Sequence, residues 1–223
     1  MKLPDSHEEM QSELSESLQA SRSMFKSGPE KQVFDASFTY GRLAGQLLAN
    51  AVVAVEHKKT DSKTGLLEYS AFVEQAEAKL TLSRRVADSA RSFAVMILDL
   101  DNFKTLNDTL GHPVVDAAFL IPAARAVQRS VRADSDLVGR FGGEEFVVLL
   151  DGVGRDESQI VASHIHERIN SISTPNGPLG ISIGVALGES GDSYALLIND
   201  ADEALLDAKR LEGKNQTVFF EEG

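Results

Sequence analysis

The stretch that decides the fold is Leu137-Val138-Gly139-Arg140-Phe141-Gly142-Gly143-Glu144-Glu145-Phe146-Val147-Val148-Leu149-Leu150. An alternating run over residues 137–141 and an apolar run over residues 147–150 flank two glycines. Paired glycines accept the positive φ angles that tight hairpin turns need, so the pattern predicts a β-hairpin. Two carboxylates, Glu144 and Glu145, stand where the second strand leaves the turn. A polar turn can serve solubility alone, so their meaning depends on whether other carboxylates converge on them.

A second acidic group follows an apolar run earlier in the chain. Residues 93–98 are bulky and apolar, which is typical of a strand buried on both faces, and Asp99, Leu100 and Asp101 come next. Because side chains alternate along a strand, Asp99 and Asp101 are expected on the same side. Carboxylates there, facing the hairpin turn, would form a hard-oxygen site suited to Mg²⁺. Asp101 has an alternative role as the N-cap of a helix that begins at Asn102.

With both stretches in view, the sequence resembles the GGDEF-domain family of diguanylate cyclases. The matching segments, in the family's order, lie at residues 61–66, 98–108, 110–116, 142–146, 182–186 and 201–215. The resemblance begins near residue 61 and runs to the C-terminus. It implies a palm-like α/β fold of the kind shared with nucleotidyl cyclases.

The order of apolar patterns also predicts an α/β class, with a mixed central sheet flanked by helices. By resemblance, the hairpin and the strand that ends at Asp99 are expected to be neighbours at the centre of that sheet. The remaining elements are predicted as helices over residues 117–131 (bent at Pro122), 157–172 and 194–210, and as strands over residues 179–187 and 217–220.

The resemblance implies a diguanylate cyclase, which condenses two GTP molecules to cyclic di-GMP and releases two pyrophosphates. By resemblance, Asp99, the backbone carbonyl of Leu100 and Glu144 would hold Mg²⁺, or Mn²⁺ in its place. Glu145 would assist either metal binding or proton removal. Each domain would bind one GTP, so the reaction requires a homodimer with its active sites face to face.

The triphosphate is expected at the helix start formed by Asn102, Phe103 and Lys104. Free backbone N–H groups at a helix N-terminus form a ready anion site. By resemblance these groups cradle the triphosphate, and Lys104 and Lys209 contact phosphate oxygens.

Guanine recognition falls by resemblance to Asn107 and Asp116. A carboxylate accepts hydrogen bonds from the N1–H and the N2 amino group of guanine, which adenine does not offer. Three residues depart from the family's pattern, namely Lys63, Val115 and Leu206. These departures leave room for an alternative: a catalytically silent GTP-binding domain that acts as a regulatory or interaction module.

The usual product-inhibition site is predicted to be absent. Many family members carry an Arg, two variable residues and an Asp at this point of the chain. Here Ala133 stands at the Arg position, and Arg132 is one residue away from it. A displaced product site that uses Arg132 is the alternative.

Residues 1–57 are predicted to form a helical hairpin before a catalytic domain over residues 58–223. The hairpin carries narrow apolar stripes and too few apolar residues for a core of its own. It is therefore expected either to dimerise or relay a signal from an upstream partner, or to cover apolar surface of its own domain. Its most apolar stretch, residues 43–55, is too short to span a membrane, and no signal peptide is expected.

Composition narrows the classes of partner. The chain has 223 residues, 42% hydrophobic and 25% charged, which is typical of a globular protein. A net charge of −12 disfavours nucleic acid, and it also means that a triphosphate site must supply local cations. The absence of cysteine fits a reducing compartment, which here would be the bacterial cytoplasm.

Overall fold

The computed structural model describes residues 60–86, 92–189 and 191–221. In this part of the chain the main sheet has six strands in the order β1-β3-β4-β2-β7-β8. The strands are β1 (Leu67–Glu68), β2 (Ser92–Leu100), β3 (Leu137–Gly142), β4 (Glu145–Asp151), β7 (Ile181–Glu189) and β8 (Thr217–Phe219). Strand β2 runs antiparallel to both β4 and β7, whereas β1 pairs with β3, and β7 with β8, in parallel. The sheet is therefore mixed, and the hairpin strand β4 is the neighbour of β2, as predicted.

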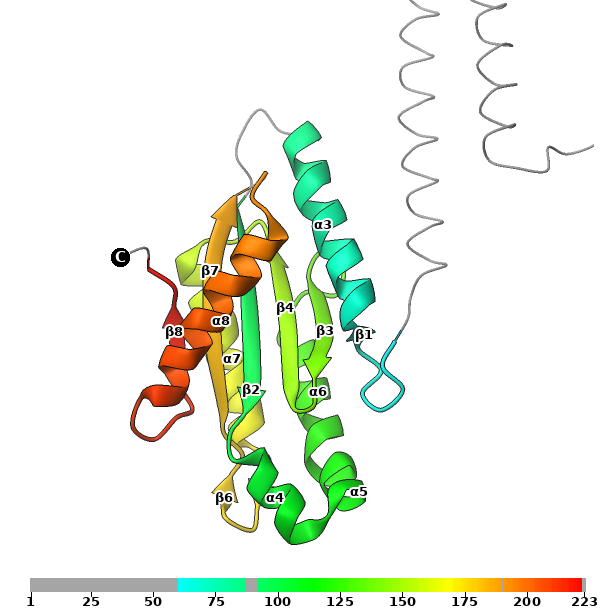
Figure 1. Ribbon diagram of the computed structural model, residues 1–223, viewed down its shortest axis with the longest axis vertical. Coiled ribbons are helices and arrows are strands. Elements are labelled where there is room, and N and C mark those ends of the chain that lie inside the picture. The colour runs from blue at the N-terminus through cyan, green and yellow to red at the C-terminus, as the bar shows by residue number, and fades with distance from the viewer. Residues whose placement is uncertain (1–59, 87–91, 190, 222–223) are drawn as a thin grey trace, which may run out of the picture. The chain divides into compact units, whose positions relative to one another are not determined.

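Helices cover both faces of this sheet (Figure 1). Helices α3 (Tyr69–Val86) and α8 (Tyr194–Arg210) lie on the near face, and α6 (Ile121–Gln128) and α7 (Arg155–Asn170) lie behind it. Two short helices, α4 (Phe103–Leu110) and α5 (His112–Val115), follow β2, and a ribbon of β5 (Ser173–Thr174) and β6 (Gly177–Pro178) precedes β7. The predicted hairpin of residues 1–57 lies outside the described residues.

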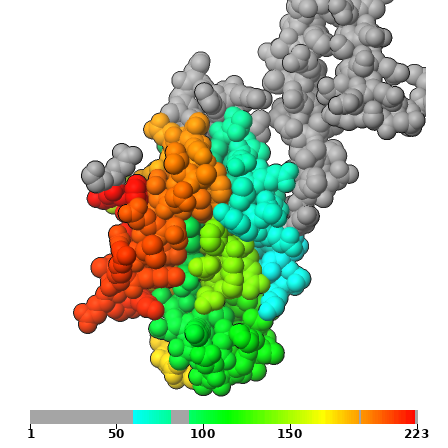
Figure 2. Space-filling view, viewed as in Figure 1, coloured from blue at the N-terminus to red at the C-terminus, as the bar shows by residue number. Residues whose placement is uncertain are grey.

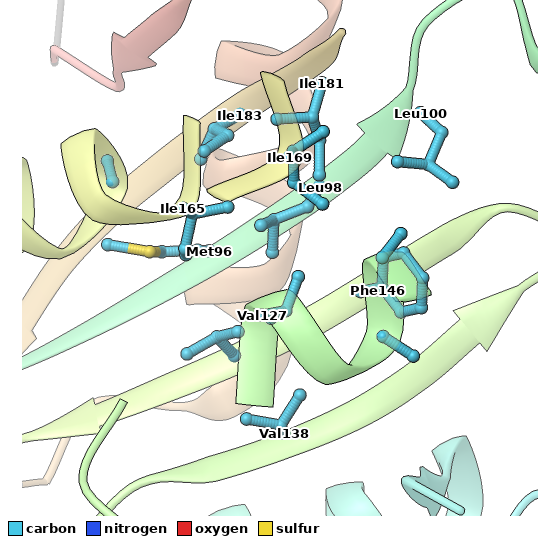
Figure 3. Packing of buried hydrophobic residues seen from close by; sticks show 14 of the residues in the cluster. Met96, Leu98, Leu100, Val127, Val138, Phe146, Ile165, Ile169, Ile181 and Ile183 are labelled. Atoms are coloured by element: carbon cyan, nitrogen blue, oxygen red, sulfur yellow. The ribbon is translucent and has the colours of Figure 1, made fainter. Parts of the chain in front are cut away.

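The two faces of β2 build two cores. Ala94, Met96 and Leu98 pack with residues of α6 and α7, as Figure 3 shows for Met96 and Leu98 beside Ile165 and Val127. The alternate residues Phe93, Val95 and Ile97 belong to the other core, together with Phe72 of α3 and Leu205 of α8. Strand alternation therefore directs Asp99, which follows this second series, towards the α8 side.

The helical run before β3 differs from the prediction. A π-helical turn, η1 (Asp116–Leu120), joins α5 to α6, and the Ile121 N–H donates to the carbonyl of Asp116. Pro122 follows directly and has no N–H to donate one turn back, which is compatible with a wider turn at this point. The run also ends at Gln128 rather than at residue 131.

Helix α7 begins at Arg155, two residues earlier than predicted. The reason is a cap in which the Gly154 N–H donates to Glu157 Oε2 at 3.0 Å. No helix in the described ranges is both long and apolar enough to cross a bilayer.

Candidate active site

Asp99 and Glu145 face each other across the centre of the sheet. They are register partners in the antiparallel pair of β2 and β4. Because side chains alternate along a strand, Glu145 points to the same side of β4 as Val147 and Leu149. These two residues pack in the core beneath α8. Both carboxylates therefore lie on the α8 side, where Lys209 Nζ is 2.8 Å from Asp99 Oδ2. The predicted convergence of the strand end and the hairpin is confirmed, whereas Lys209, expected at a phosphate, pairs with Asp99.

Negative charge is concentrated at this point. Burial raises the pKa of Glu145, and the neighbouring charges of Asp99 and Glu144 raise it further, while Lys209 opposes them. One lysine thus faces at least three carboxylates. Such an excess of negative charge attracts a divalent cation.

Glu144 and Leu100 lie close to this pair. The Leu100 N–H approaches the backbone carbonyl of Glu144 at 3.4 Å, so the hairpin turn lies against the end of β2. Among the described residues there is no group of three or more acidic or histidine side chains placed to hold a metal. A cation here would therefore take oxygen ligands from two carboxylates, a backbone carbonyl and the phosphates of a ligand, a set that suits Mg²⁺.

The turn itself differs from the prediction. Neither Gly142 nor Gly143 has a positive φ angle, so the two-glycine corner is not a tight turn of the predicted type. The register instead shifts between Arg140 and Gly142, and Gly142 pairs with Glu145, so that Gly143 and Glu144 form the turn. A Cβ atom at Gly142 would lie 3.3 Å from Glu145 Oε2, whereas one at Gly143 would meet nothing within 4 Å. The glycines therefore leave bare backbone beside the carboxylates, and hairpin atoms reach the surface between α8 and α3 (Figure 2).

Arg140 joins the turn to a distant loop, which sequence reasoning missed. Its NH2 group donates to the carbonyl of Gly143 at 2.7 Å, and its NH1 group lies 2.9 Å from Asp61 Oδ2. Burial alone would raise the pKa of Asp61, but hydrogen bonds from Thr64 and Arg140 outweigh this effect and hold the pKa below its usual range. Arg140 thereby fixes the loop over residues 61–66 against the hairpin turn.

Helix α4 starts where the sequence predicted an anion site. The helix begins at Phe103, and Asn102 takes a left-handed conformation with φ 57°. The Phe103 side chain is buried, so only its backbone N–H can face a ligand, whereas Lys104 is exposed. Lys214 Nζ lies 3.4 Å from Asn102 Oδ1 and adds a second lysine at this helix start.

The two residues predicted to recognise guanine differ in their surroundings. Asn107 Oδ1 is buried and has no hydrogen-bond partner among the described residues. A buried acceptor without a partner is costly, so this oxygen is suited to a donor from a ligand. Asp116 lies in the turn after α5, and its Oδ2 is 2.6 Å from Lys63 Nζ.

Asp101 is neither a helix cap nor part of the acidic pair. Its carboxylate accepts hydrogen bonds from Ser182 Oγ and from the Asn215 N–H, both at 2.8 Å. Burial raises its pKa in spite of these bonds. Asp101 therefore ties the end of β2 to β7 and to the loop that carries Lys214.

His166 of α7 extends this tie. Its Nδ1 lies 3.2 Å from Asn215 Oδ1, and its Nε2 lies 2.8 Å from Thr217 Oγ1. A neutral ring can donate to the first oxygen and accept from the second. Burial lowers the pKa of His166, although Asn215 and Asp101 oppose the shift.

The histidine predicts a pH dependence of stability. Because the pKa is lower in the folded state, the unfolded chain takes up the proton first as the pH falls. The contribution of His166 is therefore complete above its unfolded pKa of about 6.5 and is lost as the pH falls from there to the folded pKa. Urea unfolding between pH 7.5 and 5.5 should show a shallower loss of stability in His166→Gln than in the natural protein. Equal slopes would show that His166 does not titrate as described.

The residues expected near a product-inhibition site are engaged within the domain. Arg132 donates to both carboxylate oxygens of Asp136 and, at 2.5 Å, to the carbonyl of Asp151. Asp136 is buried, and although burial alone would raise its pKa, the bonds from Arg132 hold the pKa below its usual range. Ala133 is exposed and offers no charge.

The acidic pair of Asp99 and Glu145 lies at the end of β2 that leads to the start of α4, where Lys104 and Lys214 add positive charge. This arrangement is suited to bind a phosphate-bearing ligand together with a divalent cation.

Comparison with known proteins identifies the family. The family profile "Diguanylate cyclase, GGDEF domain" matches residues 58–216. The probable diguanylate cyclase DgcC of Escherichia coli (strain K12) is 39% identical over 131 residues, which make up 57% of this chain and 34% of DgcC. The chain belongs to the GGDEF-domain diguanylate cyclase family, and it spans about a third of the length of this curated relative.

Two solved structures are similar to this fold. The diguanylate cyclase SiaD of Pseudomonas aeruginosa, solved in complex with its activator SiaC, is 28% identical with a TM-score of 0.67, and the match covers 95% of this chain and 79% of SiaD. The GGDEF domain of DgcB from Caulobacter crescentus, solved in complex with c-di-GMP, is 25% identical with a TM-score of 0.65, and the match covers 73% of this chain and 93% of that domain.

Proposed function

We propose that this chain is a diguanylate cyclase, which condenses two GTP molecules to cyclic di-GMP and two pyrophosphates in the bacterial cytoplasm. The observation that carries the proposal is the pairing of Asp99 with Glu145 in the register of β2 and β4. This pair lies at the end of β2 from which the chain passes to the start of α4. Membership of the GGDEF family supports the same reaction.

The phosphates and the metal are bound by different residues of the site. Asp99, the Leu100 carbonyl and Glu144 would hold Mg²⁺, or Mn²⁺ in its place, which when bound neutralises phosphate charge and lowers the pKa of a 3′-hydroxyl. The N–H groups at the start of α4 bind the triphosphate, together with Lys104 and Lys209. For Lys209 this requires that its ammonium leave Asp99, from which it is 2.8 Å away.

The guanine base binds at the far end of α4. Asp116 accepts hydrogen bonds from the N1–H and the N2 amino group, and the buried oxygen of Asn107 accepts a further one. Adenine has a hydrogen-bond acceptor at N1 and no amino group at C2, so it would leave these acceptors without donors.

Each condensation forms one phosphorus–oxygen bond and breaks another. The 3′-oxygen of one GTP attacks the α-phosphorus of the other, and the bond between that phosphorus and the pyrophosphate breaks. The proton of the 3′-hydroxyl passes to a base. Glu145, the register partner of Asp99, either accepts this proton or assists metal binding.

Two domains are needed for each product, because each one binds a single GTP. The proposal therefore includes a homodimer with the active sites face to face, and residues 1–57 as the segment that dimerises or receives an upstream signal. It also includes the absence of the usual product-inhibition site, which the internal bonds of Arg132 and the small side chain of Ala133 support.

A second candidate is a domain that binds GTP without turnover and acts as a regulatory or interaction module. The ion pair of Asp99 with Lys209 favours it, because this carboxylate of the proposed metal site already has a cationic partner. Incubation with GTP and Mg²⁺, followed by chromatography, separates the two. Formation of cyclic di-GMP that stops on addition of EDTA supports the cyclase, whereas retained GTP without product supports the silent domain.

A further inference from the structure

Lys63 lies against the residue proposed to recognise guanine. Its Nζ is 2.6 Å from Asp116 Oδ2, across 53 positions of sequence. The Lys63 side chain is 53% exposed and that of Asp116 is 22% exposed. The lysine therefore covers the outer side of a carboxylate that remains partly open to a ligand.

The loop that carries Lys63 is held firmly. The Asp61 carboxylate accepts hydrogen bonds from Thr64 N at 2.8 Å and Thr64 Oγ1 at 2.7 Å, and the Gly65 N–H donates to the Asp61 carbonyl at 2.8 Å. Arg140 then fixes Asp61 to the hairpin turn. The backbone beneath Lys63 is thus fixed by contacts on both sides, which sets this lysine apart from a surface lysine on a free loop.

Asp116 can bind Lys63 and a guanine base at the same time. A carboxylate offers about four acceptor positions. The ammonium group of Lys63 takes one position on Oδ2, which leaves positions on both oxygens for the N1–H and the N2 amino group. On guanine, the O6 atom is adjacent to N1 and is itself an acceptor. It therefore comes close to the carboxylate oxygen that receives N1–H, where a cation relieves the repulsion between the two oxygens.

We propose that Lys63 donates a hydrogen bond to O6 of the guanine base and is a specificity-determining residue of the site. This inference rests on the proposed function, because it takes the guanine base to lie at Asp116. Lys63 and Asp116 together then read three adjacent groups of the base, namely O6, N1–H and the N2 amino group. Adenine carries an amino donor in place of O6, so the ammonium group of Lys63 would repel it.

The test compares GDP with 6-thio-GDP by isothermal titration calorimetry in Mg²⁺. These diphosphates lack the pyrophosphate leaving group, and sulfur at position 6 is a poorer acceptor than oxygen. The natural protein should bind GDP about tenfold more tightly than 6-thio-GDP, a ratio expected for one charge-assisted hydrogen bond that is partly exposed. In Lys63→Met this ratio should fall close to that caused by the size of sulfur alone, and GDP should bind about tenfold more weakly than in the natural protein.

The ratio separates the proposed contact from a general effect of charge. Loss of the ammonium group alters Asp116 equally for both nucleotides, so that effect cancels in the ratio. Arg129→Met, which removes an exposed cation at the end of α6, is the matched control and should leave both affinities unchanged. Lys63→Arg keeps a donor and should retain part of the preference.

Two results would overturn the inference. If Lys63→Met binds GDP as tightly as the natural protein or more tightly, Lys63 acts as a lock on Asp116 that the base must displace. If the preference over 6-thio-GDP persists in Lys63→Met, another group reads O6. A natural protein that binds neither GDP nor GTP would overturn the proposed function itself, and the inference with it.

Discussion

Glu144→Gln is expected to lower the formation of cyclic di-GMP from GTP by at least about 100-fold. Glutamine has the shape of glutamate but no charge, so the hairpin turn should persist. The variant loses one of the two carboxylates proposed to hold Mg²⁺, at a point where the remaining ligands are Asp99, the Leu100 carbonyl and phosphate oxygens. The rate should be measured by chromatography of the product at saturating GTP and Mg²⁺.

The matched control is Glu167→Gln, which removes one negative charge from the exposed face of α7. Its rate should equal that of the natural protein. Circular dichroism should be unchanged in both variants, because neither substitution changes the size of the side chain. A Glu144→Gln protein that keeps most of its activity would contradict the proposed metal site, and an altered circular dichroism spectrum would point to misfolding of the turn instead.

Gly184→Ala is expected to destabilise the domain by about 3 kcal/mol or more. A Cβ atom at this position would lie 2.1 Å from the carbonyl oxygen of Ala201 and 2.3 Å from the backbone N of Leu205. Both atoms belong to the backbone of α8, which cannot rotate away as a side chain can. The whole helix must therefore move off the sheet, and much of a typical domain stability of roughly 5–15 kcal/mol is lost.

Gly143→Ala is the control for this experiment. A Cβ atom there meets nothing within 4 Å, and the residue has no positive φ angle, so stability should change by no more than about 0.5 kcal/mol. Urea unfolding followed by circular dichroism measures both variants. Equal midpoints for Gly184→Ala and the natural protein would show that α8 packs less closely on β7 than described.

Local patterns in the sequence predicted much of the fold. The apolar run before Asp99 and the runs on either side of the two glycines predicted strands, because burial and alternation are local properties, whereas their adjacency was an expectation from the family resemblance. Alternation also predicted that Asp99 would point to one definite face. The predicted helix over residues 194–210 has the bounds of α8.

Contacts between distant segments could not be predicted in the same way. Lys209 and Asp99 are far apart in the sequence, and nothing in the pattern around either residue indicates that their side chains form an ion pair. The same holds for Arg140, which reaches back to Asp61, and for His166, which holds Asn215. Such partners depend on strand order and helix placement, which a periodic pattern does not determine.

Backbone details at the turn were also beyond local reasoning. The glycines of the hairpin predicted positive φ angles, but the register shift near Arg140 gives the chain a different path. Asp101 looked like a helix cap because it precedes Asn102, yet its partners come from β7 and the loop after α8. In both cases a tertiary contact outweighs a local preference.

The measurement that tests the central claim most directly is the conversion of GTP by the natural protein over a range of protein concentrations. Product is separated by chromatography and identified by mass. We expect cyclic di-GMP and pyrophosphate in a ratio of one to two, with a rate per domain that rises with protein concentration because two domains must meet. If GTP binds but no cyclic di-GMP forms at any concentration, the cyclase is contradicted and the silent GTP-binding domain takes its place.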